Sequence, residues 1–201
     1  MQLPDEQLVA AYLDHGDQRA FRTLVERHQE RIFGYLLGMV RDRETANDLF
    51  QETFLRVIAA MQRQRGSYTM QDRWLAWVMR IARNAALDHL RSQKKWVDVS
   101  VEDDDGASFW DLLPDDAPAI DEELHRLERM DWLEECIQRL PPEQREVLLL
   151  RHEAELTFRE IAGLTNCSIN TALGRMRYAL LNLRRIIASS KKKPLAEIVE
   201  A

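Results

Sequence analysis

Apolar side chains recur at spacings of three and four along almost the whole chain, the repeat that places them on one face of an α-helix. In the first half of the chain this repeat predicts helices over residues 5–13, 19–37, 45–63 and 73–94. An alternating strand pattern is found at most over residues 96–101, which is a short stretch. We therefore expect an all-α protein in which the first ~95 residues form one helical bundle.

Charge is sorted along the sequence into three blocks. Residues 1–97 carry 15 lysines and arginines against 12 acids, residues 98–135 carry 2 against 15, and residues 136–201 carry 11 against 7. Like charges at the density of the middle block oppose compaction, so we expect an extended acidic linker over residues 98–122. Two basic blocks joined by a segment that repels nucleic acid are typical of two nucleic-acid-binding modules.

The C-terminal block predicts a helix-turn-helix. Thr157 and Glu160 have the spacing of a capping box, residues 166–168 suit a turn, and a long helix follows over 169–188. From residue 169 to residue 193 there are seven basic side chains and no acid, so we expect this helix to bind duplex DNA. The candidate DNA contacts are Asn170, Thr171, Gly174, Arg175, Arg177 and Tyr178, and the expected buried stripe is Leu173, Met176, Leu180, Leu183 and Ile187.

A basic stripe with aromatic neighbours runs along the helix predicted over residues 73–94. Arginines that follow phosphates and rings that stack on bases are what single-stranded DNA requires. The alternative is a solvated helix face with its tryptophans in the core. The candidate contacts are Trp74, Trp77, Arg80, Asn84 and Arg91, with Trp74 lying between the basic and the apolar faces.

The helix predicted over residues 45–63 exposes a mixed surface opposite its apolar face. Asp48, Gln51, Glu52 and Leu55 lie there. Such a face is usually only solvated, but a leucine among carboxylates also suits a contact with another protein. Leu55 is therefore the residue of this face that hints at a protein partner.

Nothing in the sequence indicates catalysis or a bound cofactor. The histidines and the two cysteines, Cys136 and Cys167, lack metal-ligand spacing, and neither a glycine-rich phosphate loop nor a nucleophile motif is found. Asp103–Asp105 could bind a divalent cation, but consecutive acids in a linker are nearly always solvated. The chain begins without a signal-peptide pattern and has no apolar run of membrane-spanning length. We expect a cytoplasmic protein that is not an enzyme and holds no metal.

Two sets of motifs resemble those of bacterial sigma factors. Residues 47–57, Asn-Asp-Leu-Phe-Gln-Glu-Thr-Phe-Leu-Arg-Val, and residues 74–84, Trp-Leu-Ala-Trp-Val-Met-Arg-Ile-Ala-Arg-Asn, are similar to the second conserved region of the sigma-70 family. Leu140-Pro, Glu160-Ile-Ala and Ile169-Asn-Thr resemble the fourth region. Their order and spacing and the acidic connector resemble the extracytoplasmic-function (ECF) subgroup, and the similarity covers residues 10–188.

This resemblance implies a factor that binds core RNA polymerase, confers promoter recognition and assists promoter melting during initiation. It implies region 2 over residues 1–97, the acidic linker over 98–122, the region 4 helix-turn-helix over 123–190 and a flexible tail over 191–201. The helix over 45–63 would dock on the largest polymerase subunit, with Asp48, Gln51, Glu52 and Leu55 as the contact candidates. The helix over 73–94 would read the single-stranded −10 element, and the helix-turn-helix would read the duplex −35 element. An anti-sigma factor would be a further partner.

Two details depart from the family and two rivals stay open. Leu173 and Gly174 stand where the family often has a basic residue and a serine. The main rival is a helix-turn-helix regulator that binds paired half-sites as a dimer without being a polymerase subunit. The other is a helical hydrolase that uses the acids of 103–105, for which the sequence offers no further catalytic group.

Overall fold

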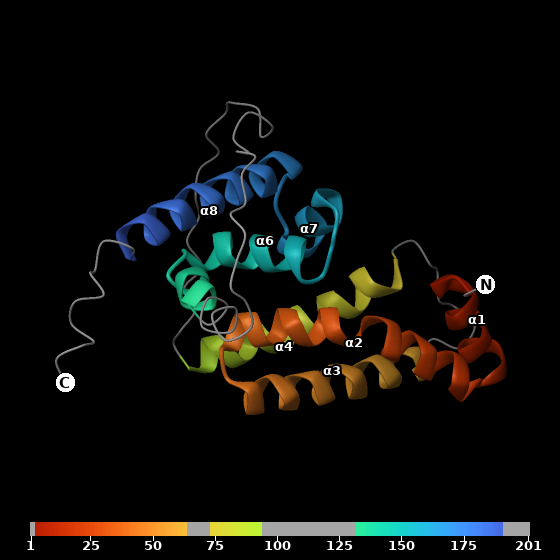
Figure 1. Ribbon diagram of the computed structural model, residues 1–201. Helices are drawn as coiled ribbons and strands as arrows, with labels where there is room; N and C mark the ends of the chain where they lie inside the picture. The colour runs from red at the N-terminus through yellow and green to blue at the C-terminus, as the bar shows by residue number, and fades with distance from the viewer. Residues whose placement is uncertain (1–2, 64–72, 94–131, 191–201) are drawn as a thin grey trace, which may run out of the picture.

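The computed structural model describes residues 3–63, 73–93 and 132–190, and within these ranges every regular element is an α-helix (Figure 1). The predicted all-α fold is therefore confirmed. The acidic linker with its Asp103–Asp105, the loop at 64–72, the start of the predicted C-terminal domain and the tail over 191–201 lie outside the described residues. The N-terminal helices are α1 (Asp5–His15), α2 (Gln18–Val40), α3 (Arg43–Arg63) and α4 (Trp74–Ser92), and the C-terminal helices are residues 132–138, α6 (Pro142–His152), α7 (Phe158–Thr165) and α8 (Ile169–Ser190).

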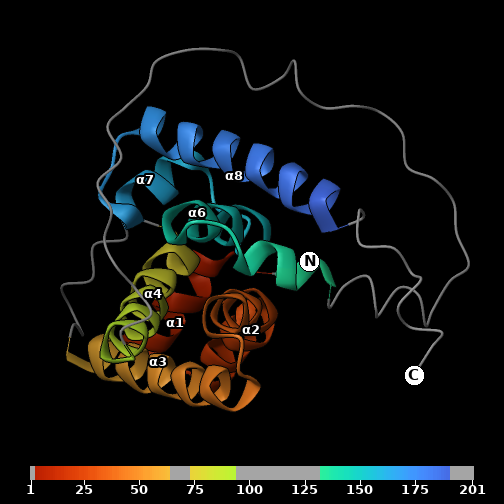
Figure 2. The same ribbon diagram turned by 90° about the vertical axis from the view of Figure 1, so that its left-hand side faces the viewer.

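Short connections join the first three helices. Gly16, with φ of 68°, ends α1, and the Asp17 carboxylate accepts a hydrogen bond from the backbone N–H of Arg19 at 2.9 Å to begin α2. Arg41, with φ of 62°, ends α2, and Asp42 accepts from the N–H of Thr45 at 2.7 Å. Because these breaks are so short, successive helices turn back and pack against each other (Figure 2).

The helix-turn-helix also begins where the sequence predicts, and its second helix ends at Ser190, two residues later than predicted. Thr157 and Glu160 form the capping box of α7, and Asn166, in the left-handed conformation with φ of 57°, ends that helix. The Ser168 hydroxyl then accepts from the N–H of Thr171 at 2.9 Å to begin α8. These short-range bonds fix the angle at which α8 leaves α7.

The buried stripe of α8 differs from the prediction. The most buried apolar residues are Ala172, Met176 and Ala179, whereas Leu173 does not belong to the core. Alanines let two helices approach closely, so the face of α8 that carries them packs against α6 and α7. Leu173 lies beside this face and stays half-buried. The expected stripe was therefore wrong at its first position, Leu173, and at its last, where Ile186 rather than Ile187 packs against the core.

Helix α6 is enclosed by the rest of the molecule. It lies between α8 and the N-terminal helices (Figures 1 and 2), and it packs against α2 as well as against α7 and α8. Every residue from Arg145 to Leu150 is buried, so this helix has no solvent-facing side over that stretch. The two helical bodies predicted from the sequence thus share one continuous apolar core. Within the described ranges, no helix combines the length and the apolar character needed to cross a membrane.

Candidate nucleic-acid and partner interfaces

The outer face of α3 carries an exposed leucine among polar side chains. Leu55 is 69% exposed, and Asp48 and Gln51 are exposed beside it. Glu52 is half-buried, and its Oε1 pairs with Nη2 of Arg56 at 2.6 Å, one helical turn away. The other side of α3 is held in the core by Leu49 and other apolar residues. An apolar side chain held out on a rigid helix among carboxylates suits a protein partner better than a phosphate backbone.

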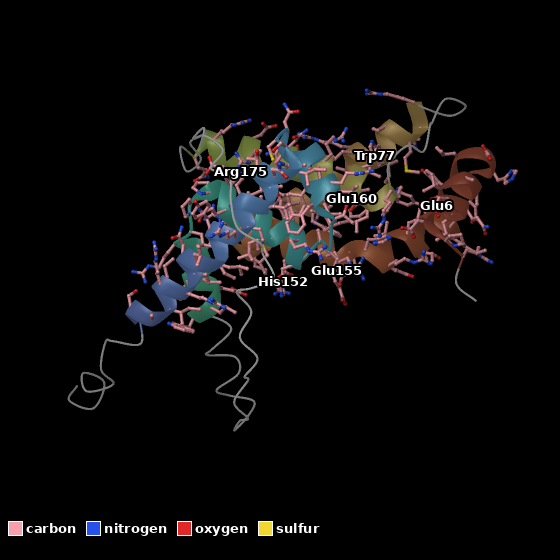
Figure 3. All side chains as sticks on the ribbon, turned by 90° about the horizontal axis from the view of Figure 1, so that it is seen from above. Glu6, Trp77, His152, Glu155, Glu160 and Arg175 are labelled. Atoms are coloured by element: carbon pink, nitrogen blue, oxygen red, sulfur yellow. The ribbon has the colours of Figure 1, made fainter. Side chains whose placement is uncertain are left out.

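Four of the five candidates on α4 share one face. Arg80, Asn84 and Arg91 are exposed, and Trp77 is half-buried with part of its ring packed on the core. Trp77 lies toward the end of α4 that meets α7 (Figure 3). The face therefore combines exposed arginines with an aromatic edge that is held in place, as a surface for single-stranded nucleic acid requires.

Trp74, the fifth candidate, lies in the core. Its side chain is fully buried, and its ring centroid is 5.4 Å from that of His28 in α2. The helical wheel places position 74 between two faces, and burying a large ring is the more favourable of the two orientations. No base can reach the ring in this arrangement, so the prediction of Trp74 as a DNA contact is wrong.

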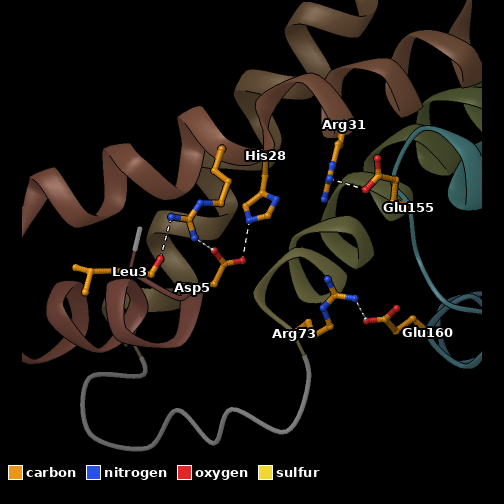
Figure 4. A network of polar contacts seen from close by, with 8 residues as sticks. Leu3, Asp5, His28, Arg31, Arg73, Glu155 and Glu160 are labelled. Atoms are coloured by element: carbon orange, nitrogen blue, oxygen red, sulfur yellow. Dashed lines mark hydrogen bonds and ion pairs between the residues drawn. The ribbon is translucent and has the colours of Figure 1, made fainter. Parts of the chain in front are cut away.

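His28 joins α1 to α2 at this place (Figure 4). Its Nε2 lies 2.7 Å from Oδ2 of Asp5, whose other carboxylate oxygen pairs with Arg27. Burial lowers the pKa of the His28 imidazole below its ordinary value, and the Asp5 carboxylate offsets only part of this effect. Its Nδ1 is buried and meets no hydrogen-bond partner among the described residues, so a proton there would have no acceptor.

We therefore expect acid to destabilise the N-terminal bundle through His28. Above the ordinary histidine pKa of 6.5 both the folded and the unfolded state are neutral here. As the pH falls below it, the unfolded state binds the proton first, so the free energy of unfolding decreases. Urea unfolding at about pH 7.5 and about pH 5.5 should show a larger loss for the wild type than for His28→Gln, which does not titrate. Equal losses in the two proteins would contradict this role.

The outward face of α8 carries most of the predicted duplex contacts. Asn170 and Tyr178 are exposed, Thr171 and Arg177 are half-buried, and no described atom comes within 4 Å of a Cβ built at Gly174. Helix packing among the described residues therefore does not require that glycine. The bare backbone of Gly174 remains available for close approach by a ligand.

Arg175 points elsewhere. It is half-buried, and its Nε is buried without a hydrogen-bond partner among the described residues. Burial has the largest effect on the pKa of Glu146 in α6 and raises it, whereas the positive charge of Arg175 lowers it. This candidate thus lies on the inner side of α8, not on the DNA-facing side where the sequence analysis placed it.

A buried polar cluster, missed by the sequence analysis, joins the two helical bodies. Glu146 is 1% exposed, and its two carboxylate oxygens accept hydrogen bonds from Nε and Nη2 of Arg83 in α4, at 2.7 and 3.2 Å. Burial raises the pKa of Glu146, and Arg83 acts against that rise. Tyr35 of α2 is fully buried close by, and burial followed by the charge of Glu146 raises its pKa well above the ordinary value. The one signal in the sequence was an acid directly before an apolar run, Val-Leu-Leu-Leu.

Further contacts join the same two helical bodies. Arg31 of α2 pairs with Glu155 at 2.5 Å, and Nη1 of Arg73 lies 3.6 Å from Oε1 of Glu160 in α7 (Figure 4). The side chain of Gln138 donates to the backbone carbonyl of Gly38. We call the whole set of contacts between α2 or α4 and residues 132–165 the seam.

Two protein families match this chain, one in each half, and known proteins are similar to it over most of its length. The Sigma-70 region 2 family matches residues 24–95, and the Sigma-70, region 4 family matches residues 130–181. The chain is 37% identical over 172 residues to RNA polymerase sigma factor CarQ of Myxococcus xanthus, which covers 86% of this chain and 91% of CarQ. It is 31% identical over 177 residues to RNA polymerase sigma-H factor of Pseudomonas aeruginosa, covering 86% and 88%, and 26% identical over 172 residues to ECF RNA polymerase sigma factor SigW of Bacillus subtilis, covering 85% and 90%.

Solved structures share the fold. CnrH, in its complex with the cytosolic domain of CnrY, superposes with a TM-score of 0.65 at 21% identity, covering 92% of this chain and 99% of that one. The sigma factor RpoE of Bartonella quintana, in its complex with the anti-sigma factor NepR, gives 0.59 at 18% identity, covering 87% and 98%. Region 2 and region 4 therefore follow each other in this chain. The chain shares the helical fold of these solved structures, and it is similar to known sigma factors over most of its length. The chain belongs to the sigma-70 family of RNA polymerase sigma factors, in the extracytoplasmic-function subgroup.

Proposed function

We propose that three helices of this sigma factor bind three different partners. The outer face of α3 binds core RNA polymerase, the exposed face of α4 binds the single-stranded −10 element, and the outward face of α8 binds the duplex −35 element. The observation that carries the proposal is that these three faces are exposed on rigid helices of matched family regions, and that they differ in character as three different partners require. The polymerase supplies the chemistry, so no catalytic group is needed in this chain.

The domain division proposed for this function follows the sequence. Region 2 takes residues 1–97, region 4 takes 123–190, and the acidic segment 98–122 connects them, followed by the tail 191–201. We place the activity in the cytoplasm, where bacterial polymerase transcribes. An anti-sigma factor is proposed as a further partner because the two solved structures compared above were each determined as a complex with another protein, which in one of them is named an anti-sigma factor.

On α4, Arg80, Asn84 and Arg91 are proposed to follow the phosphates while the exposed edge of Trp77 stacks on a base. Extruding a base from a duplex costs a few kcal/mol, which stacking and a shaped pocket offset. On α8, Asn170, Thr171, Arg177 and Tyr178 are proposed to reach the major groove, with Gly174 allowing close backbone approach. Arg175 supports this surface from its inner side.

Removing a side chain from the α4 face should impair melting without loss of polymerase binding. We expect Arg80→Ala and Asn84→Ala each to lower the yield of open complex about tenfold, because hydrogen bonds to charged partners contribute about 1.5 kcal/mol or more. Permanganate footprinting of the promoter would report the yield, and co-purification with core polymerase would report binding. Arg22→Ala, which removes an exposed arginine from α2, is the control. A parallel loss of polymerase binding in the α4 variants would contradict the assignment.

A gel shift tests the function as a whole against the rival regulator. A dimeric helix-turn-helix regulator retards duplex DNA by itself, whereas a sigma factor retards promoter DNA strongly only together with core polymerase. We expect retardation only in the presence of core enzyme. Tight binding by the isolated chain to paired half-sites would favour the rival.

A further inference from the structure

Two apolar side chains lie outside the core near the N-terminal end of α8. Ile169 is 43% exposed, and Leu173, one turn later, is half-buried but does not belong to the core. Residues four positions apart are neighbours on one face of a helix, so these two side chains form a short apolar row. Around the helix, Leu173 lies about 60° from Asn170, one of the proposed DNA contacts. The row therefore borders the surface that is proposed to bind the −35 element.

The charge of α8 favours duplex DNA as the partner of this row. The helix carries four arginines and no acid from Ile169 to Ser190, and Arg184 and Arg185 are exposed further along it. Such a surface attracts a polyanion and suits an apolar protein surface poorly. Within the major groove the base edges present polar groups with one exception, the C5-methyl group of thymine. A thymine methyl group is thus the part of a duplex that matches an aliphatic side chain.

Gly174 allows these short side chains to come within reach of the bases. No described atom lies within 4 Å of a Cβ built there, so the backbone of α8 is open to close approach at this point. Leucine and isoleucine offer no hydrogen-bond donor to guanine or adenine, and they lack the long stem of an arginine. A glycine that brings the backbone close and a neighbouring leucine that reaches only a short way therefore suit the same contact.

We propose that Leu173, together with Ile169, reads the C5-methyl groups of thymines in the −35 element. Asn170 and Arg177 supply the polar contacts, and the apolar row selects thymine over cytosine at the neighbouring base pairs. Burying a methyl group against an aliphatic side chain is favourable, and cytosine has no methyl group at that place. The inference rests on the proposed role of α8 and adds which base that helix selects.

Deoxyuridine is the probe for this contact, because it differs from thymidine only by the missing methyl group. A promoter library randomised over the upstream element, transcribed by core polymerase with the full-length chain, first gives the preferred −35 sequence. We predict that this sequence contains thymine in one strand or the other. Deoxyuridine at one of these thymines should lower run-off transcription at limiting polymerase about fourfold, which corresponds to the ~0.8 kcal/mol of one buried CH₂ group.

Variants of the row identify the side chain that reads the methyl group. Leu173→Ala should fold normally, which circular dichroism would verify, because Leu173 does not belong to the core. On the thymine promoter we expect it to transcribe about fourfold less than the wild type, and with deoxyuridine to lose nothing further. Leu181→Ala is the matched control. It removes another half-buried leucine of α8, about 12 Å further along the helix, and should keep the full response to the methyl group.

Equal transcription from the thymine and deoxyuridine promoters by the wild type would overturn the proposal, as would a preferred element without thymine. A deoxyuridine loss that persists in both Leu173→Ala and Ile169→Ala would overturn it too, because another residue would then read the methyl group. Weaker co-purification of these variants with core polymerase, with an unchanged methyl response, would assign the row to a protein partner instead. If no base change in the upstream element altered transcription, the proposed function of α8 would fail as well. Dependence on the element without dependence on its methyl groups overturns only the reading of thymine.

Discussion

Trp74→Ala is expected to lower the free energy of unfolding of this protein by about 3–5 kcal/mol, the usual cost of removing a fully buried aromatic ring. The indole lies at the start of α4, fully buried and next to His28 of α2, so its loss leaves a cavity where two helices meet. Urea unfolding followed by circular dichroism would measure the change. Trp74→Phe, which keeps a ring in the same place, should recover most of the stability.

Trp77→Ala is the matched comparison on the same helix. Trp77 is only half-buried, so we expect a much smaller loss of stability together with weaker binding to single-stranded promoter DNA, about 1–3 kcal/mol for one stacked base. The two tryptophans, three positions apart, should therefore affect different properties. A stable Trp74→Ala protein that fails only in DNA binding would contradict the burial of its ring.

Leu55→Asp is expected to abolish binding to core polymerase at working concentrations. We expect Leu55 to be a hot spot of this interface, and a hot-spot residue costs about 2 kcal/mol or more when it is lost, so the affinity should fall about thirtyfold or further. The new carboxylate would also lie beside Asp48 and Glu52 and repel any acidic surface of the partner. Fluorescence anisotropy of labelled sigma factor titrated with core enzyme would measure the loss.

The control for that experiment is Leu3→Asp. Leu3 is also exposed, at 55%, but it belongs to the N-terminal segment before α1 and uses its backbone carbonyl to accept from Arg27. The same chemical change there should leave polymerase affinity within twofold of the wild type. Wild-type affinity in Leu55→Asp, or an equal loss in both variants, would contradict the assignment of α3 to the polymerase interface.

Local chemistry made most of the fold predictable. Helix boundaries follow from side chains that bond their own backbone a few residues away, as Asp42 and the Thr157–Glu160 capping box do. Such bonds depend on nearby residues alone, so the sequence contains the information in full. The exposed faces of α3 and α4 followed in the same way from helical periodicity.

The errors arise where distant residues decide the outcome. A helical wheel cannot say which way Trp74 turns, because the ring that receives it, His28, comes from another helix. The wheel also favoured Leu173 over the smaller Ala172, although close helix packing selects the small residue. In both cases size and hydrophobicity were known, but the shape of the space to be filled was not.

The contacts of the seam are the part of the structure that the sequence predicts least. Glu146 and Arg83 are 63 positions apart, and each looks like an ordinary surface charge on its own helix. The sequence predicted two bodies held apart by an acidic connector, whereas the described helices share one core. Only the tertiary structure brings Glu146 of α6 and Arg83 of α4 together.

Run-off transcription on a genomic DNA library with bacterial core RNA polymerase tests the central claim most directly. The reaction is performed with core enzyme alone, with the wild-type chain added, and with Leu55→Asp added. We predict discrete transcript start sites that depend on the wild-type chain and are lost with Leu55→Asp. A transcript pattern identical to that of core enzyme alone, from a chain that does not co-purify with it, would contradict the assignment as a sigma factor.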